Sequence, residues 1–163
     1  MDSTVTVGIS DYKASRQPGT LVTYALGSCV GVALYDPLTR IGGLSHIMLP
    51  SSSLCADGAA DDRMKYADTA IPDLVQELER IGAGRASLNA KIVGGANMFK
   101  STGAFHADTI GDRNIAAARS ELARLGIPVV AEDVGDSYGR TVYFLLADGK
   151  VEVRSLARAT NEI

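Results

Sequence analysis

Three apolar runs follow one another near the start of the chain. They are rich in β-branched and aromatic side chains, which is typical of strands that are at least half buried. Gly27-Ser28 separates the first run from the second, and Asp36-Pro37 opens a turn before the third. The pattern therefore predicts three successive strands, the last two forming a hairpin, over residues 20–26, 30–36 and 41–49.

Two later segments have a helical pattern instead. Apolar side chains recur at three- and four-residue steps over residues 63–81 and 112–125, and Asp112 is a suitable N-cap for the second helix. Residues 11–19 are predicted as a polar segment with a turn at Pro18-Gly19, and residues 135–140 as a turn. Further strands are predicted over residues 4–9, 88–93, 128–132, 141–146 and 151–156, with a two-residue turn at Asp148-Gly149 between the last two. Strands and helices do not alternate as βαβ units, which predicts an α+β fold.

Composition narrows the classes of protein. The 163 residues suit a single domain spanning 1–163, and the net charge of −3 argues against a nucleic-acid partner or an anionic membrane surface. No apolar run is long enough to insert into a membrane, and the first residues lack a signal-peptide pattern, which predicts a cytoplasmic protein with reduced cysteines. Two cysteines and two histidines, scattered along the chain, predict no metal site.

The predicted hairpin suggests a chemical site. If Asp36 pairs with Thr39 across a two-residue loop, Cys29 lies directly opposite His46, at a cross-strand distance of about 4.5–5.5 Å. A thiol beside an imidazole forms a nucleophile with its base, and a protonated histidine can lower the thiol pKa well below neutrality. The alternative is that Cys29 is a small buried apolar residue and His46 a hydrogen-bonded core histidine.

Small residues surround these two positions. Backbone N–H groups near Gly27 and Ser28 could stabilise an oxyanion beside Cys29. Gly94-Gly95 follows a predicted strand, but no phosphate-binding motif continues it, so close approach of the backbone to the hairpin is the favoured interpretation.

Five motifs in order make the chain similar to the CheD family, the chemoreceptor glutamine deamidases of bacterial and archaeal chemotaxis. The resemblance extends from about residue 5 to residue 156. The motifs are LGSCV at 26–30, HIMLP at 46–50, KYAD at 65–68, GGANMF at 94–99 and IGDRN at 110–114. One departure is Gly135-Asp136, where the family usually has two glycines.

The resemblance implies a layered, β-sandwich-like core with helices on one side, shared with bacterial toxins that deamidate glutamine. It also implies a catalytic trio of Cys29, His46 and Thr23, in which the threonine orients the imidazole. Lys65 and Tyr66 are substrate-facing by family position, and a solvated lysine beside a packing tyrosine is the alternative. The segment 51–62, which includes Cys55, is expected to be a loop bordering the site, and His106 a surface loop histidine.

The implied reaction converts glutamines of methyl-accepting chemotaxis receptors to glutamate through a Cys-His thioester mechanism, without a cofactor. Receptor methylesterase activity is an implied side reaction. Two alternatives remain. The chain could be a non-catalytic receptor-binding adaptor that regulates a CheC-type phosphatase of phosphorylated CheY, or a thiol hydrolase of small amides.

Overall fold

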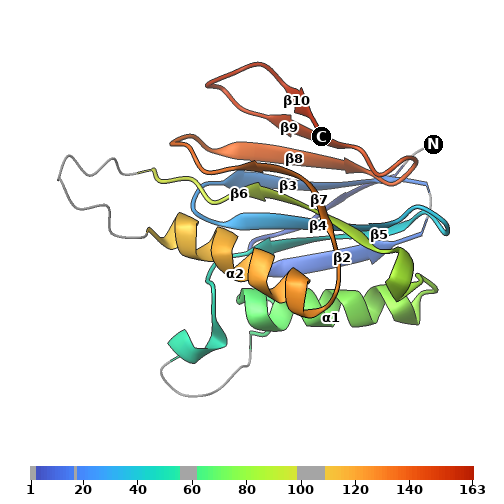
Figure 1. Ribbon diagram of the computed structural model, residues 1–163. Helices are drawn as coiled ribbons and strands as arrows, with labels where there is room; N and C mark the ends of the chain where they lie inside the picture. The colour runs from blue at the N-terminus through green and yellow to red at the C-terminus, as the bar shows by residue number, and fades with distance from the viewer. Residues whose placement is uncertain (1–2, 17, 56–61, 99–108) are drawn as a thin grey trace.

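The computed structural model describes residues 3–16, 18–55, 62–98 and 109–163 (Figure 1). Within these ranges the helices are α1 (Ala67–Arg80) and α2 (Ile110–Arg124), with short 3-10 segments η1 (Ser52–Leu54) and η2 (Arg85–Ser87). The strands are β1 (Thr4–Thr6), β2 (Asp11–Ser15), β3 (Thr20–Leu26), β4 (Val30–Asp36), β5 (Ile41–Ile47), β6 (Asn89–Gly94), β7 (Val129–Val134), β8 (Arg140–Leu145), β9 (Val151–Arg154) and β10 (Asn161–Glu162).

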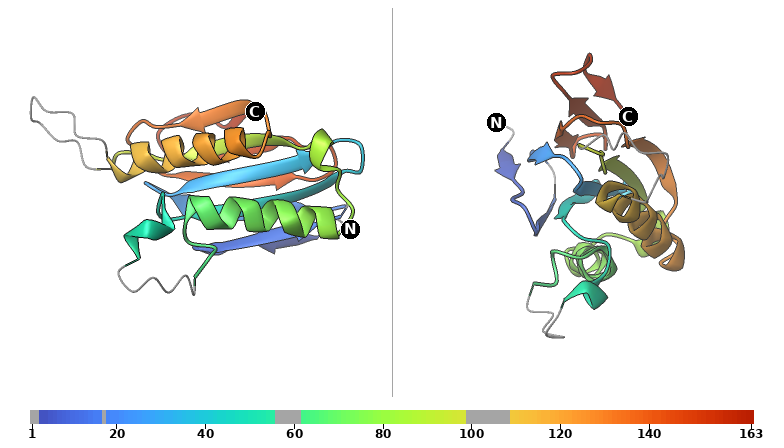
Figure 2. Two further views of the ribbon diagram at one scale, coloured as in Figure 1. Left: turned by 60° about the horizontal axis from the view of Figure 1, so that its bottom comes forward. Right: turned by 90° about the vertical axis from the view of Figure 1, so that its left-hand side faces the viewer.

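The strands form two sheets stacked face to face. The first sheet has the order β1-β3-β8-β9-β10, and the second has the order β2-β5-β4-β6-β7. Both helices cover the face of the second sheet that points away from the first (Figure 2). The structure thus confirms the predicted α+β fold, a two-sheet core of mixed strands with both helices on one side.

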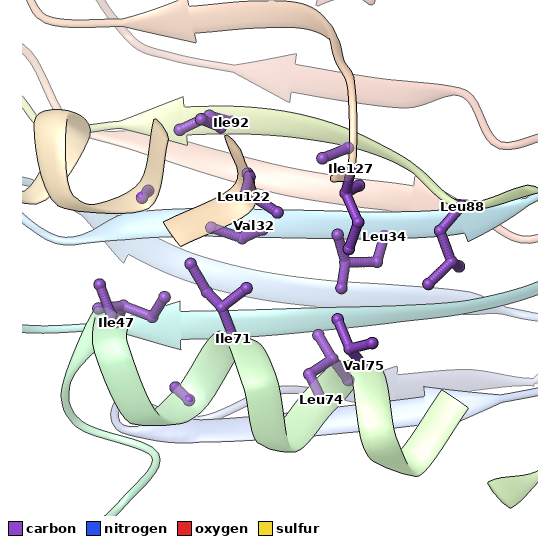
Figure 3. Close-up of a cluster of buried hydrophobic side chains, with 14 of the residues drawn as sticks. Val32, Leu34, Ile47, Ile71, Leu74, Val75, Leu88, Ile92, Leu122 and Ile127 are labelled. Atoms are coloured by element: carbon purple, nitrogen blue, oxygen red, sulfur yellow. The ribbon is translucent and has the colours of Figure 1, made fainter. Parts of the chain in front are cut away.

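One hydrophobic core lies between the helices and the second sheet. Ile71, Leu74 and Val75 of α1 point toward the strands, as Figure 3 shows. On α2 the buried residues recur at three- and four-residue steps, as the amphipathic pattern predicts. Burying each large aliphatic side chain contributes roughly 1.5–3 kcal/mol, so this core fixes both helices on the sheet.

The second core lies between the two sheets, and two glycines of β5 let all three layers meet closely. A Cβ on Gly42 would lie 2.7 Å from a methyl group of Leu146, on the side of the first sheet. A Cβ on Gly43 would lie 2.7 Å from Leu74 of α1, on the opposite side. Both glycines are regularly paired with β4 and form no bulge. The glycine pair therefore allows close packing rather than shifting the register.

The β4–β5 register differs from the prediction by two residues. Asp36 pairs with Ile41 instead of Thr39, which leaves a four-residue loop, and Gly31 lies opposite His46. The Asp36 carboxylate stabilises the longer loop because it accepts hydrogen bonds from Leu38 N at 2.9 Å and Thr39 Oγ1 at 2.8 Å. Because the shift is even, side chains at 29 and 46 keep the same face, although they are not directly opposite.

Other boundaries also differ from the prediction. No strand was predicted in the polar segment 11–19, but β2 forms there and pairs with β5. Helix α2 begins earlier than predicted, with Thr109 as its N-cap and Asp112 at the third position of a capping box. Between β8 and β9 the loop spans five residues, 146–150, rather than two, with the Leu145 N–H bonded to the Lys150 carbonyl at 2.8 Å.

Candidate active site

A threonine and a histidine meet across the interface of the two sheets. Thr23 belongs to β3 of the first sheet and His46 to β5 of the second, and both side chains are buried. Thr23 Oγ1 lies 2.7 Å from His46 Nδ1 and 2.8 Å from the carbonyl oxygen of Val7. The sequence places these two residues far apart, so the sheet packing creates the contact.

The hydrogen-bond chain assigns the tautomer of the imidazole. A carbonyl oxygen only accepts, so the single hydroxyl hydrogen of Thr23 points to Val7. Thr23 Oγ1 must then accept a hydrogen bond from His46, which places the ring proton on Nδ1. Nε2 consequently carries the lone pair, and it has no hydrogen-bond partner within the described ranges. The contact therefore holds His46 in the tautomer that leaves Nε2 buried and unprotonated.

Cys29 lies one residue before β4, on the side that faces the inter-sheet core. Its carbonyl oxygen accepts a hydrogen bond from Gly95 N at 2.8 Å. Gly94 has a φ of +105°, and a Cβ there would lie 2.4 Å from the Cys29 carbonyl oxygen. Only glycine lets the chain pass this close to the cysteine. The interpretation of Gly94-Gly95 as a close-approach pair is thus confirmed.

Burial keeps both reactive groups uncharged. Desolvation raises the pKa of the Cys29 thiol, and the hydrogen bond from its own backbone N–H lowers it by less. Desolvation also lowers the pKa of His46 below its ordinary value of 6.5. The expectation that a charged histidine lowers the thiol pKa is therefore wrong for the free protein, because the imidazole is neutral at pH 7.

These directions set the pH dependence of the site. The predicted role of His46 as a base requires its neutral form, and its lowered pKa preserves that form to more acidic pH. Activity should therefore fall only as pH decreases through a midpoint below 6.5, measured as initial rates against pH. Alkylation of Cys29 by iodoacetamide, followed in a Cys55→Ala background, should have its midpoint above the ordinary pKa of cysteine. An acid limb with a midpoint above 6.5 would contradict the assignment of His46.

Removing the Thr23 hydroxyl should remove the hydrogen bond that orients the His46 imidazole. In Thr23→Val the Nδ1–H loses its acceptor, so the ring can adopt the other tautomer or rotate, and we expect kcat to fall about 10²-fold. Thr23→Ser is the matched control, since it keeps the hydroxyl and should retain most of the activity. Equal losses in the two variants, in steady-state kinetics, would show that the hydroxyl is not the group that matters.

The other predicted site residues lie on neighbouring segments. The Gly27 carbonyl accepts a hydrogen bond from Ala96 N at 2.8 Å, and Ser28 lines a hollow of about 370 Å³ beside the first turn of α2. The Lys65 carbonyl accepts the N–H groups of residues 48 and 49, directly after β5. Tyr66 is only 5% exposed, whereas Lys65 is half-buried, so Lys65 is the more accessible of the pair.

The predicted bordering loop and surface histidine fall partly or wholly outside the described ranges. Of the loop at 51–62, residues 51–55 and 62 are described, and residues 52–54 form η1. Residues 56–61 and His106 lie outside the described ranges.

One residue beside the site escaped the sequence analysis. Asn114 of α2 is completely buried, and its side-chain amide bonds the carbonyls of Ser28 and Met48, each at 2.9 Å. The signal was a polar residue within the apolar stripe of an amphipathic helix. Such a residue marks a side chain that needs buried partners.

Cys29 and His46 share a face, and Thr23 holds the protonated Nδ1 of the imidazole so that Nε2 keeps its lone pair. This arrangement is typical of hydrolases with a cysteine nucleophile. Comparison with known proteins identifies the family within this class of hydrolases. The family model described as CheD chemotactic sensory transduction matches residues 48–155. The chain belongs to the CheD family, as its relatives also show.

Two relatives illustrate the similarity. The probable chemoreceptor glutamine deamidase CheD of Moorella thermoacetica is 53% identical over 94% of this chain and 92% of that protein. The protein of the same name from Caldanaerobacter subterraneus subsp. tengcongensis is 43% identical over 96% of both chains. Among solved structures, the hypothetical protein YfiH of Bacillus licheniformis matches 76% of this chain and 49% of its own, with 17% identity and a TM-score of 0.46. In the described ranges no helix is sufficiently long and apolar to span a membrane.

Proposed function

We propose that this chain is a chemoreceptor glutamine deamidase, a hydrolase that converts glutamine side chains of methyl-accepting chemotaxis receptors to glutamate. Membership of the CheD family and the names of its relatives support the activity and the substrate. The single observation that carries the chemistry is the Thr23–His46 contact, which leaves Nε2 available as a base on the face that carries Cys29.

The first half of the reaction forms a thioester. His46 Nε2 accepts the thiol proton of Cys29 as the sulfur attacks the side-chain amide carbon of the glutamine. The tetrahedral oxyanion is stabilised by backbone N–H groups around Gly27, Ser28 and Cys29. The protonated His46 then donates its proton to the departing nitrogen, the C–N bond breaks, and ammonia leaves.

The second half hydrolyses the thioester. His46, neutral again, accepts a proton from water, and the hydroxide attacks the thioester carbon. The C–S bond breaks, the proton returns to the sulfur, and the product is a glutamate side chain with the thiol regenerated. No metal or organic cofactor takes part. The same acyl-enzyme route also accommodates a receptor methyl ester, which would release methanol instead of ammonia.

The cellular setting follows from the substrate. The receptor segments that carry methylation sites face the cytoplasm, so we place the protein there, with a CheC-type phosphatase as a partner and no nucleic acid or membrane insertion. Lys65 is the accessible candidate for contacting the receptor, and the Tyr66 ring lies 5.9 Å from its ammonium group.

The test is direct conversion of a receptor fragment. The purified chain is incubated with the cytoplasmic fragment of a cognate receptor, and glutamine-to-glutamate conversion is read by peptide mass spectrometry, with released ammonia measured in parallel. Conversion at particular glutamines is expected. Binding of several cognate receptors without conversion would overturn the proposal in favour of the adaptor function, and hydrolysis of free glutamine instead would favour a small-amide hydrolase.

A further inference from the structure

Asn114 is a polar residue in an otherwise apolar position. It lies on the face of α2 that packs inward, together with Gly111, Ile115, Ala118 and Leu122. Its side chain is fully buried. The carbonyl oxygen Oδ1 of this side chain has no partner within the described part of the chain. Burying an unpaired acceptor is unfavourable, so the residue must contribute through its two N–H donors.

Both donors are used on the two segments that carry the reactive groups. Nδ2 lies 2.9 Å from the carbonyl of Ser28, which precedes Cys29, and 2.9 Å from the carbonyl of Met48, which follows His46 by two residues. Two carbonyl oxygens can only face N–H groups, which fixes the orientation of the amide.

The position of these two bonds relative to the β-ladder is informative. The β4–β5 register ends at the pair Val30 and Ile47, and the next residues outward are Cys29 and Met48. At the point where strand pairing stops, the Asn114 amide bridges the two segments in place of a ladder hydrogen bond. Without this bridge, the segment that carries Cys29 would be joined to β5 only through the ladder that ends at Val30 and Ile47.

Helix α2 is itself firmly fixed at this point. A Cβ on Gly111 would lie 2.5 Å from the carbonyl oxygen of Gly95 and 2.6 Å from that of Ala96, so the helix is in backbone contact with this segment. Gly95 in turn donates to the Cys29 carbonyl. The helix is thus a rigid support from which the Asn114 amide reaches both reactive segments.

We propose that Asn114 is a positioning residue, whose amide bridge between Ser28 and Met48 holds the Cys29 sulfur in line with His46 Nε2. The residue acts by fixing the relative position of the nucleophile and its base, through its bonds to the two backbone carbonyls. The catalytic role of that pair rests on the proposed function.

The first test is the kinetics of Asn114→Ala on the receptor fragment. Because a misplacement of about 1 Å can cost about 10²-fold in rate, kcat should fall about 10–100-fold while KM stays nearly unchanged. Ala118→Gly is the matched control, since it destabilises the same buried face of α2 without touching Ser28 or Met48. Its kcat should remain close to that of the wild type when both variants are assayed well below their melting temperatures.

The second test needs no receptor and so is independent of the proposed substrate. Alkylation of Cys29 by iodoacetamide is measured at pH 7.5 in a Cys55→Ala background, for His46→Ala, Asn114→Ala and the double variant. His46→Ala should slow alkylation about tenfold, because the thiol loses its proton acceptor. If Asn114 positions the pair, His46→Ala should have little further effect once Asn114 is alanine.

The outcomes separate positioning from a purely structural role. If the two effects on alkylation multiply, or if kcat of Asn114→Ala stays within the range of the Ala118→Gly control, the proposal is overturned. Should Asn114→Ala fail to fold, Asn114→Asp has the same volume, lacks the paired donors and undergoes the same cycle. Failure of the receptor assay with an intact alkylation coupling would reject the substrate but keep the positioning role.

Discussion

Cys29→Ala is expected to abolish glutamine deamidation, with a loss of at least about 10⁴-fold in kcat/KM. The variant lacks the sulfur that forms the thioester, and water activated by His46 would have to attack the amide directly. The thiol is small and half-buried, so its removal should change the free energy of unfolding by no more than about 1 kcal/mol. Peptide mass spectrometry of the receptor fragment and a chemical unfolding curve measure the two quantities.

Cys55 provides the matched control for this prediction. It is the second cysteine of the chain and is also half-buried, close to Tyr66 on the loop that follows β5. Cys55→Ala should keep wild-type activity. A Cys29→Ala protein that retains more than a few per cent of the wild-type rate, or a Cys55→Ala protein that loses it, would place the nucleophile elsewhere.

Asp133→Ala is expected to destabilise the fold by about 3–5 kcal/mol, because it removes the buried counter-ion of the Arg140 guanidinium and leaves only the exposed Asp136 carboxylate at 3.9 Å. Asp133 belongs to β7 of the second sheet and Arg140 to β8 of the first, and the exposed fractions of the two side chains are 4% and 0%. Arg140 Nε donates to the carboxylate at 3.0 Å, and Asn161 Nδ2 donates to the same carboxylate at 3.0 Å. Arg158 completes the cluster as an ion pair with Asp133.

The neighbouring residue of the same strand supplies the control. Glu132 forms an ion pair with Arg119, whose side chain is 51% exposed, so Glu132→Ala should change stability by no more than about 1 kcal/mol. Guanidinium unfolding of both variants measures the difference. The double variant Asp133→Ala, Arg140→Met should regain part of the loss, since the unpaired charge is gone. Equal effects at 132 and 133 would show that the buried pair does not link the sheets.

Local signals in the sequence predicted much of the fold and of the site. The bounds of β3 and β4 agree with the prediction because apolar runs there end at turn residues. Strand β2 was missed although Tyr12 and Ala14 alternate with polar residues, because the run is short and mostly polar and its pairing with β5 is a long-range contact. His46 was named from the hairpin pattern as well as from the family resemblance, and Thr23 from the resemblance alone. The Thr23–His46 contact itself depends on how the sheets stack.

The hairpin error has a specific cause. The pattern fixes which face a side chain occupies, because this repeats every two residues, but it does not fix the length of the loop. Loop length depends on the Asp36 carboxylate, which bonds Leu38 and Thr39, and on Arg40, whose φ of 58° is left-handed. The Cys29 side chain therefore lies on the predicted face, but it is not directly opposite His46. Asn114 was missed because its partners are separated from it by 86 and 66 positions in the sequence.

The Thr23–His46 contact across the two sheets also bears on synthesis of the protein. In the first sheet β3 lies between β1 and β8, and β8 comes from the last quarter of the chain. A nascent polypeptide still attached to the ribosome can pair β4 with β5, yet it cannot complete the sheet that supplies Thr23 until β8 has emerged. The Thr23–His46 contact is therefore formed late. An unfinished or truncated chain would contain Cys29 but lack an oriented His46.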